Sequence, residues 1–302
     1  MRFRISLILS LLFLLSSQFV VGQNTLSYQA DSIFCKAKDL YRVHKYDDCL
    51  RALEKSNAMF LADKNWESYI ETLAQLGVQT AVLKDSLQGH KYMDRAIYLA
   101  DSFQLVDKHV HSVAIAAKGN AFYWKGEYEF TLVYWEKALE VLKTSSVLDN
   151  EYYLGLLNNL GYVYEALGYY EKSSVNHLEV VKIAEETYGA DHPKSLYRIN
   201  KWLEFLVIRK EYNKLWSELL KRKADYESLD DTYEVKADYY WIMARYYIAR
   251  EDFTEAKDYL NQAESLYIKL NSVSSFKNQR VYATWAVLEE AQENFEAALP
   301  HY

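Results

Sequence analysis

The sequence predicts an all-α protein, a right-handed superhelical solenoid of about seven helix-turn-helix repeats. The first observation is self-similarity, because Gly119 and Gly161 lie 42 residues apart and each is followed by an aromatic, a glycine and a tyrosine at +3, +7 and +9. The second is composition, since the chain has only two prolines and nine glycines and no sustained strand-like alternation. The third is a 16% aromatic content, which suits repeats that seal against one another with bulky side chains.

The same frame extends along the whole chain at intervals of 40 to 42 residues. Its anchor residues are Ala37, Gly77, Gly119, Gly161, Leu203, Ala244 and Ala286. The residue four before each anchor is always apolar or aromatic, and the one at +9 is aromatic in six of seven repeats. The anchor and the residue at +12 are usually small, which lets two antiparallel helices approach closely. Leu203 and Leu215 break this rule, so the fifth repeat is expected to be the most splayed.

This pattern of a small residue, an aromatic, a glycine turn, an aromatic and an alanine resembles the tetratricopeptide repeat (TPR). The resemblance covers roughly residues 30–302. The usual repeat is about 34 residues long. The longer period here, with the segment Glu185 to Pro193 between the fourth and fifth repeats, resembles the kinesin-light-chain type.

The N-terminal segment has the pattern of a secretory signal peptide. Arg2 and Arg4 precede an apolar stretch from Ile5 to Leu15, and small or modest residues occupy positions 20–22. The alternative is an uncleaved anchor, but the apolar run is shorter than the ~20 residues needed to span a membrane. We therefore expect residues 1–22 to be removed, leaving residues 23–302 as a TPR-like solenoid that is exported, periplasmic or secreted, with no later membrane span.

The charge balance argues against a nucleic-acid partner. Without the signal peptide the chain has 33 basic and 42 acidic side chains, a formal charge of −9. Binding to phosphate backbones depends on clustered basic residues, which this chain lacks.

Two cysteines fall in the first repeat. In an oxidising compartment Cys35 and Cys49 could pair. However, Cys49 is expected at the contact between the two helices while Cys35 points about 200° around its helix from the anchor, which favours two separate thiols.

The sequence predicts no catalytic residue, no metal site and no cofactor. His109 and His111 form the only close histidine pair, with no carboxylate or cysteine at ligand spacing. Asp191 and His192 could suggest a catalytic pair, but with Pro193 they also fit a turn that begins a helix. No phosphate-binding loop or serine elbow is present.

The TPR resemblance implies that the first helix of each repeat lines a concave groove. Asparagines there could bond an extended peptide backbone, and aromatics could provide contact area. Whether individual aromatics face the groove or pack between repeats stays open, but adjacent residues such as Tyr123 and Trp124 cannot both enter one seam. The groove positions are Asn120, Tyr123, Trp124, Asn158, Tyr162, Glu165, Asn200, Glu204, Trp241 and Arg245.

The ligand expected from these positions is a peptide segment that is basic or neutral. The chaperone-binding TPR proteins use a basic clamp for a carboxylate, and here only Lys38 with Arg42 could form one, while Glu165 and Glu204 are central. A non-catalytic protein- or peptide-binding scaffold is therefore expected. The alternatives are the sensor or regulatory part of a larger caspase-like peptidase or signalling protein, which the resemblance implies, and a glycan-binding repeat protein.

The seventh repeat is expected to be incomplete, because its second helix begins near Phe295 and contains Pro300. Trp285, Leu288 and Leu299 would then be partly uncovered, which favours self-association through the C-terminal end.

Overall fold

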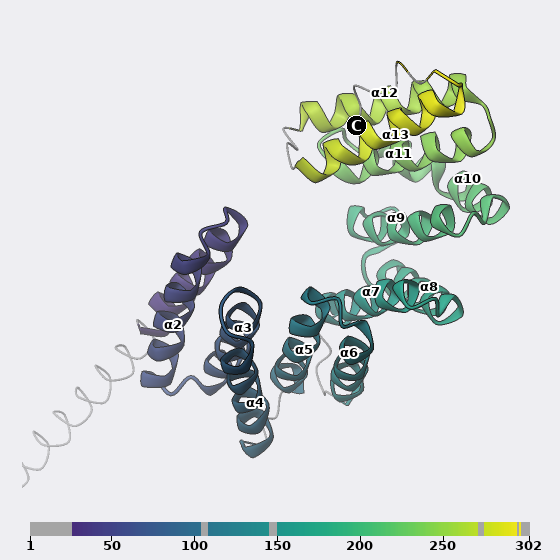
Figure 1. The fold of residues 1–302 in the computed structure, drawn as a ribbon. Helices are drawn as coiled ribbons and strands as arrows, with labels where there is room; N and C mark the ends of the chain where they lie inside the picture. The colour runs from purple at the N-terminus through teal and green to yellow at the C-terminus, as the bar shows by residue number, and fades with distance from the viewer. Residues whose placement is uncertain (1–25, 104–107, 145–149, 271–274, 295, 297–302) are drawn as a thin grey trace, which may run out of the picture. The chain divides into compact units, whose positions relative to one another are not determined.

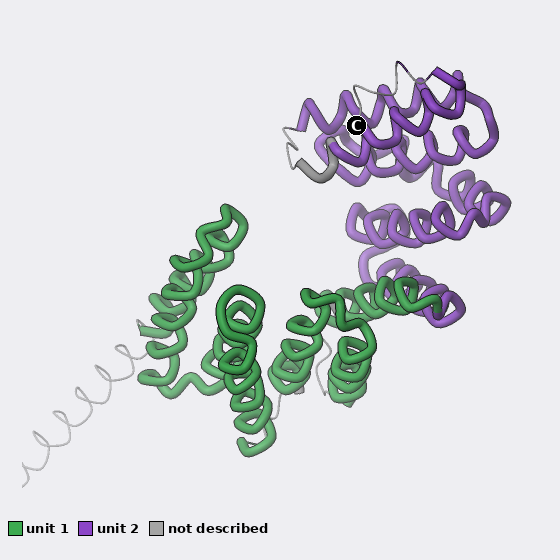
Figure 2. The backbone as a smooth tube through the Cα atoms, in the orientation of Figure 1, with its two compact units in different colours: residues 1–168 green, residues 169–302 purple. Residues whose placement is uncertain are grey.

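A computed structural model describes residues 26–103, 108–144, 150–270, 275–294 and 296 (Figure 1). In these residues all regular secondary structure is helical. The chain forms two compact units, residues 1–168 and 169–302, which are described separately below as unit 1 and unit 2 (Figure 2). The boundary falls in the turn at Gly168, within the fourth repeat.

Unit 1 consists of consecutive antiparallel helices. A helix over residues 26–42 comes first. It is followed by α2 (Tyr46–Ala62), α3 (Trp66–Leu83), α4 (Ser86–Ser102), α5 (Lys108–Trp124), α6 (Tyr128–Lys143) and α7 (Asn150–Ala166). Within unit 1, each helix from α2 to α6 packs on the next one in the chain, and α3 also packs on α5, as expected of a stacked repeat.

Unit 2 continues the same alternation. Its helices are α8 (Tyr170–Tyr188), α9 (Pro193–Ile208), α10 (Tyr212–Ser228), α11 (Glu234–Ala249), α12 (Phe253–Lys269) and α13 (Ser275–Ala291). The first helices of the fifth, sixth and seventh repeats are α9, α11 and α13, and α11 packs on both of the others. These three helices therefore form one layer within unit 2.

The backbone confirms the repeat frame at the turn between paired helices. The residue at +7 from the anchor has a left-handed conformation in six of the seven repeats, with φ between 57° and 79° for the described residues. Only two of these six are glycine, so the sequence signal was visible in only two turns. The residues are His44, Gly126, Gly168, Lys210, Glu251 and Glu293; Lys84, with φ −139°, is the exception.

Small residues bring the paired helices of unit 1 together, as the pattern predicted. A Cβ added to Gly77 would lie 2.6 Å from Met93 Cγ and 2.9 Å from the carbonyl oxygen of Gly89. A Cβ on Gly119 would overlap the indole of Trp135, which is buried. These glycines are therefore required by the close approach of α3 to α4 and of α5 to α6.

The fifth repeat is more splayed than the second, third and sixth, in line with the prediction. Leu203 and Leu215 are fully buried where other repeats have small residues. Within the units, helices α9 and α10 contact each other less extensively than α3 with α4, α5 with α6 or α11 with α12. Two leucines hold the axes apart, and Trp202, Tyr226 and other large side chains fill the added space.

The C-terminal expectation is partly wrong. Leu288 is fully buried in the core of unit 2 rather than uncovered. Trp285 is half-buried and donates a hydrogen bond from Nε1 to Glu264, at 3.1 Å. Leu299 and Pro300 lie outside the described residues, as does the predicted signal peptide.

The cysteines are separate thiols in this structure, with Cys35 exposed and Cys49 buried. Among the described residues, none of the helices has the length and apolar character needed to cross a membrane.

Candidate functional site

Asn120 on α5 is held by a hydrogen bond to its amide oxygen. Its Oδ1 accepts a hydrogen bond of 3.0 Å from Nε1 of Trp135. Because an indole nitrogen can only donate, the atom facing it must be the amide oxygen. The same Nε1 also donates to the Ala116 carbonyl, at 3.2 Å, so the indole is fixed on both sides. The Nδ2 donors of half-buried Asn120 make no recorded bond in the described part of the chain, and they can serve a ligand carbonyl.

One turn further along α5, Tyr123 and Trp124 are both exposed, which agrees with the expectation that they cannot both enter one seam. Their exposed fractions are 36% and 59%. The Tyr123 ring stacks on Trp135, with centroids 5.4 Å apart, and meets Trp124 edge to face at 6.0 Å. The Tyr123 ring is therefore supported by Trp135, while the Trp124 ring is more exposed to solvent. The donor of Asn120 lies beside this pair on the same helix.

The three predicted residues of α7 are more enclosed. Asn158 is buried, and its Oδ1 has no hydrogen-bond partner among the described residues. Tyr162 and Glu165 are half-buried and interact with other residues. Among these three residues, Asn158 therefore offers a buried amide oxygen that is not yet bonded within the described part of the chain.

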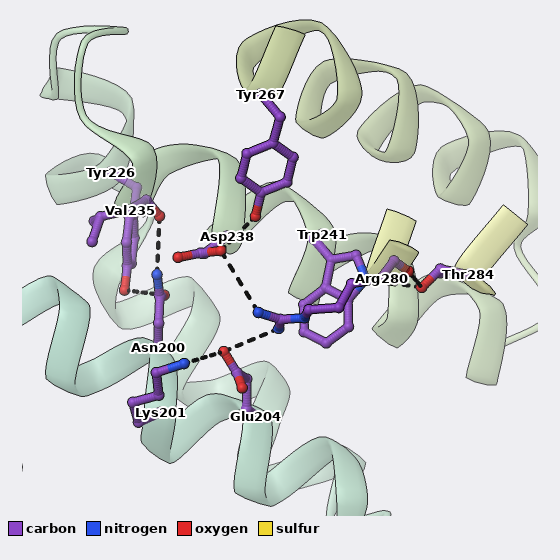
Figure 3. A network of polar contacts seen from close by, with 10 residues as sticks. All are labelled: Asn200, Lys201, Glu204, Tyr226, Val235, Asp238, Trp241, Tyr267, Arg280 and Thr284. Carbon is purple, nitrogen blue, oxygen red and sulfur yellow. Dashed lines mark hydrogen bonds and ion pairs between the residues drawn. The ribbon is translucent and has the colours of Figure 1, made fainter. Parts of the chain in front are cut away.

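Asn200 on α9 is a structural residue, contrary to its predicted place in the groove. It is 1% exposed. Its Nδ2 donates to the Val235 carbonyl at 2.9 Å, and its Oδ1 accepts from the Tyr226 hydroxyl at 2.7 Å (Figure 3). The side chain thus ties α9 to α10 and to the start of α11. Replacing it would open the core, so a variant of Asn200 cannot isolate an effect on ligand binding.

Glu204 belongs to a network of charges that crosses the layer of α9, α11 and α13 (Figure 3). Its Oε1 lies 3.1 Å from Nζ of Lys201 and 3.1 Å from a guanidinium nitrogen of Arg280. Arg280 also lies 3.9 Å from Oδ1 of buried Asp238, which accepts from the Tyr267 hydroxyl. Burial and the neighbouring Asp238 raise the pKa of the Tyr267 phenol, so this hydroxyl stays a donor.

Trp241 and Arg245 on α11 flank a pocket in unit 2. The Trp241 indole is buried and donates to Oγ1 of Thr284 at 2.8 Å. The guanidinium carbons of Arg280 and Arg245 lie 3.8 and 5.1 Å from the Trp241 ring centroid. The pocket has a volume of about 410 Å³ and is lined by Val207, Tyr212, Trp241, Arg245, Ile248, Ala249, Arg280, Ala283, Thr284 and Val287.

Arg280 was missed by sequence reasoning. It lies six residues before the anchor Ala286, outside the groove positions that the repeat frame provides. Its reach across α11 to Glu204 depends on how α13 packs, and no local pattern encodes that. The expectation of a basic or neutral ligand loses its basis in unit 2, because Glu204 is already neutralised by Lys201 and Arg280.

Arg245 differs from Arg280 in having no ion pair within the described residues. Burial lowers the pKa of its guanidinium, and the charge of Arg280 lowers it further. Lys201 and Arg280 pair with Glu204, and Arg280 also pairs with Asp238, whereas Arg245 lines the pocket without an ion pair of its own among the described residues.

The other candidate motifs have structural roles. Pro193 begins α9, and His192 caps it by accepting from the Lys194 backbone N–H at 3.1 Å, which confirms the predicted turn. His111 lies 3.1 Å from Asp101. In the described part of the chain, no three histidine, cysteine, aspartate or glutamate side chains gather where they could hold a metal.

The comparisons with known proteins agree with this architecture. A tetratricopeptide repeat family model matches residues 154–194, which span α7, α8 and the start of α9. None of the curated proteins matches the sequence.

Several solved structures share the fold. The apo form of the quorum sensor NprR from B. thuringiensis matches with a TM-score of 0.63 and 15% identity, over 95% of this chain and 80% of that one. The signal transduction ATPase PH0952 from Pyrococcus horikoshii, which has a tetratricopeptide repeat sensor, matches at 0.67 and 16%, over 93% and 43%. A Rap protein complexed with Competence and Sporulation Factor matches at 0.55 and 14%, over 89% and 72%. The chain therefore has the fold of TPR-like helical solenoids.

Proposed function

We propose that this chain is a non-catalytic scaffold that binds an extended peptide or protein segment along the first helices of its repeats. The observation that carries the proposal is the cluster on α5. There Asn120 presents an oriented N–H₂ donor beside the exposed rings of Tyr123 and Trp124. A peptide carbonyl needs such a donor, and aromatic side chains supply contact area with few rotatable bonds.

Two further findings support a binding role. One of the structures that share the fold was solved with Competence and Sporulation Factor bound, and another is a quorum sensor.

The test is selection of peptides from a phage-displayed library of random 12-residue sequences on the purified chain. We expect enriched peptides to bind the parent and to lose at least tenfold in affinity with the Tyr123→Ala/Trp124→Ala variant, because the exposed aromatic area is removed. Tyr98→Ala is the matched control, since Tyr98 is an exposed aromatic on α4, a second helix of its repeat.

Peptides that bind all three proteins equally would contradict the α5 site. Failure to enrich any peptide, with the protein folded by circular dichroism, would contradict the peptide-binding function itself.

A second candidate function is that of a sensor region in a larger signalling protein. It is favoured by the similarity to PH0952, of which this chain covers 43%. Mass measurement of the protein isolated from its native source decides between the two, because a sensor region of this kind has a mass well above the 35.5 kDa of the present chain.

The protein is further proposed to be exported. Arg2, Arg4 and the apolar run that follows support this proposal. Material recovered from the native host should begin at or near Gln23, and N-terminal mass analysis that finds Met1 intact would contradict it.

A further inference from the structure

The pocket between α9, α11 and α13 joins a positive charge to an apolar wall. Arg245 and Arg280 line it together with Val207, Ile248 and Val287. Its volume of about 410 Å³ lies within the ~300–1,000 Å³ that is usual for ligand pockets. The pocket can therefore hold a small group that is charged on one side and apolar on the other.

The two arginines differ in their ion pairs. Arg280 lies within 3.9 Å of both Glu204 and Asp238, so its charge is balanced inside the protein. Arg245 has no ion pair among the described residues, although it is half-buried. A partly buried guanidinium that makes no ion pair is unfavourable, and a bound carboxylate would supply a partner in a bidentate geometry.

We infer that this pocket binds a carboxylate carried next to an apolar group, and specifically the C-terminal carboxylate of a peptide whose last side chain is apolar. The choice of a peptide rests on the proposed function. In a C-terminal residue the carboxylate and the side chain share one Cα, which matches a pocket lined both by guanidinium groups and by aliphatic side chains. With an internal Asp or Glu, the carboxylate and the apolar group would belong to different residues.

This inference reverses the expectation drawn from the sequence. The repeat frame suggested that Glu204 would make the centre of the groove acidic. Because Glu204 is occupied by Lys201 and Arg280, the charge that remains available in the pocket of unit 2 is that of Arg245.

The test uses three acetylated tripeptides: Ac-Ala-Ala-Leu with a free carboxylate, the same peptide amidated, and amidated Ac-Ala-Glu-Leu. A fourth probe is 4-methylpentanoate, a free acid without a peptide bond. Binding is followed by the indole N–H resonance of Trp241, identified among the seven tryptophans by its loss in Trp241→Phe. We expect the free-carboxylate peptide to bind at least tenfold more tightly than either amidated peptide.

Arg245→Gln removes the charge and should weaken binding of the free-carboxylate peptide at least tenfold. Arg250→Gln is the matched control, because Arg250 is exposed at the end of α11 and does not line the pocket. Arg245→Lys, which keeps the charge but loses the bidentate fork, should retain part of the affinity.

The outcomes separate this inference from the proposed function. Equal binding of the acid and amidated peptides would overturn the carboxylate pocket and leave peptide binding intact. Binding of the internal-Glu peptide in preference to the free carboxylate would overturn the assignment to a C-terminus. Binding of 4-methylpentanoate with no binding of any tripeptide would support the pocket for an apolar acid and contradict the peptide. Unchanged affinity in a folded Arg245→Gln protein would overturn the role of Arg245.

Discussion

Unit 1 and unit 2 are built on one repeat frame, yet they bury different chemistry. The buried polar residues of unit 1 are all neutral, as in Ser112, Thr131 and Asn158. Every buried charged residue among those described lies in unit 2, namely Arg222, Lys236, Asp238 and Glu289. Among the described residues, the buried apolar side chains of unit 1 form three clusters joined by partly buried ones such as Tyr92 and Ile97, whereas those of unit 2 form one cluster.

The difference follows from how each unit fills the space between paired helices. Where small residues such as Gly77 and Gly119 allow close approach, the partner helix packs directly against the glycine backbone. Where Leu203 and Leu215 hold the helices apart, long aromatic and charged side chains must reach across several helices. Charges buried in this way are costly unless they are paired, so unit 2 depends on its ion pairs in a way that unit 1 does not.

The largest expected effect is therefore in unit 2. Arg280→Met should lower the free energy of unfolding by about 3 kcal/mol, at the low end of the range for breaking a buried pair. The value is at the low end because Glu204 keeps Lys201 and Asp238 keeps Tyr267 as partners. Chemical denaturation gives the total, and hydrogen exchange should show protection falling in α11 and α13 while α5 and α6 keep theirs.

Arg245→Met is the matched comparison, since it removes a neighbouring arginine that has no ion pair in the described residues. Its stability should equal or exceed that of the parent, because a half-buried unpaired charge is replaced by an apolar side chain. If the two replacements lower the free energy of unfolding equally, the distinction between ion-paired Arg280 and unpaired Arg245 is wrong.

The second effect is a pH dependence located in unit 2. Burial among Trp202 and Phe205 lowers the pKa of His177 to about 4, from an ordinary value of 6.5. The unfolded chain therefore binds a proton between these values and the folded chain does not. Stability from this group is fully present above pH 6.5 and is lost as the pH falls to about 4, by about 3 kcal/mol in total.

His177→Phe should abolish that part of the pH dependence, because a phenyl ring fits the same apolar surroundings without titrating. Urea unfolding of parent and variant at pH 7 and pH 4 measures the difference. His90 in unit 1, whose pKa is also lowered by burial, supplies a contribution of the same sign and is unchanged in both proteins. Equal losses of stability in parent and variant would contradict the assignment.

The third effect tests close approach in unit 1. Gly119→Ala should destabilise the chain by about 1–3 kcal/mol, because its Cβ would displace the buried Trp135 ring. Gly155→Ala on α7 is the control: nothing lies within 4 Å of its Cβ position, so it should stabilise by about 0.5–1 kcal/mol. Thermal melts of both variants check this, and a neutral Gly119→Ala would mean that α5 and α6 are not in close contact.

The comparison also separates what the sequence could predict from what it could not. The repeat frame was predictable because the spacing of small and aromatic residues is a local property, and it located the turns, the splayed fifth repeat and the exposed Tyr123 and Trp124. It could not predict that the Asn200 side chain is hydrogen-bonded to Val235 and Tyr226. A groove position fixes where a side chain starts on its helix but not which neighbour its polar atoms meet.

The site in unit 2 was predictable only in part for the same reason. Trp241 and Arg245 are frame positions, and both line the pocket. Arg280 belongs to another repeat, and it forms an ion pair with Glu204, which the repeat frame alone presents as a free carboxylate. Long-range ion pairs of this kind depend on how helices of different repeats pack, and residue spacing does not predict that packing.

The smallest expected effect concerns the turn that both units share. Gly126 in unit 1 and Lys210 in unit 2 have φ of 75° and 57°, and each follows its helix with the same pair of hydrogen bonds. In each turn the left-handed residue donates to the carbonyl three before it, at 3.0 and 3.1 Å. The next residue donates to the carbonyl five before it, at 3.0 and 2.9 Å, which is the Schellman arrangement.

A left-handed backbone destabilises a non-glycine residue by about 1–2 kcal/mol. Glycine avoids this strain but loses more conformational entropy on folding, which offsets roughly 0.5–1 kcal/mol of the gain. Lys210→Gly should therefore stabilise the protein by about 0.5–1 kcal/mol, and Gly126→Ala should destabilise it by about 1 kcal/mol. Urea unfolding at pH 7 measures both, with Lys221→Gly within α10 as the control that should instead destabilise. A Lys210→Gly variant no more stable than the parent would mean that Lys210 gains something in the turn that its backbone conformation does not reveal.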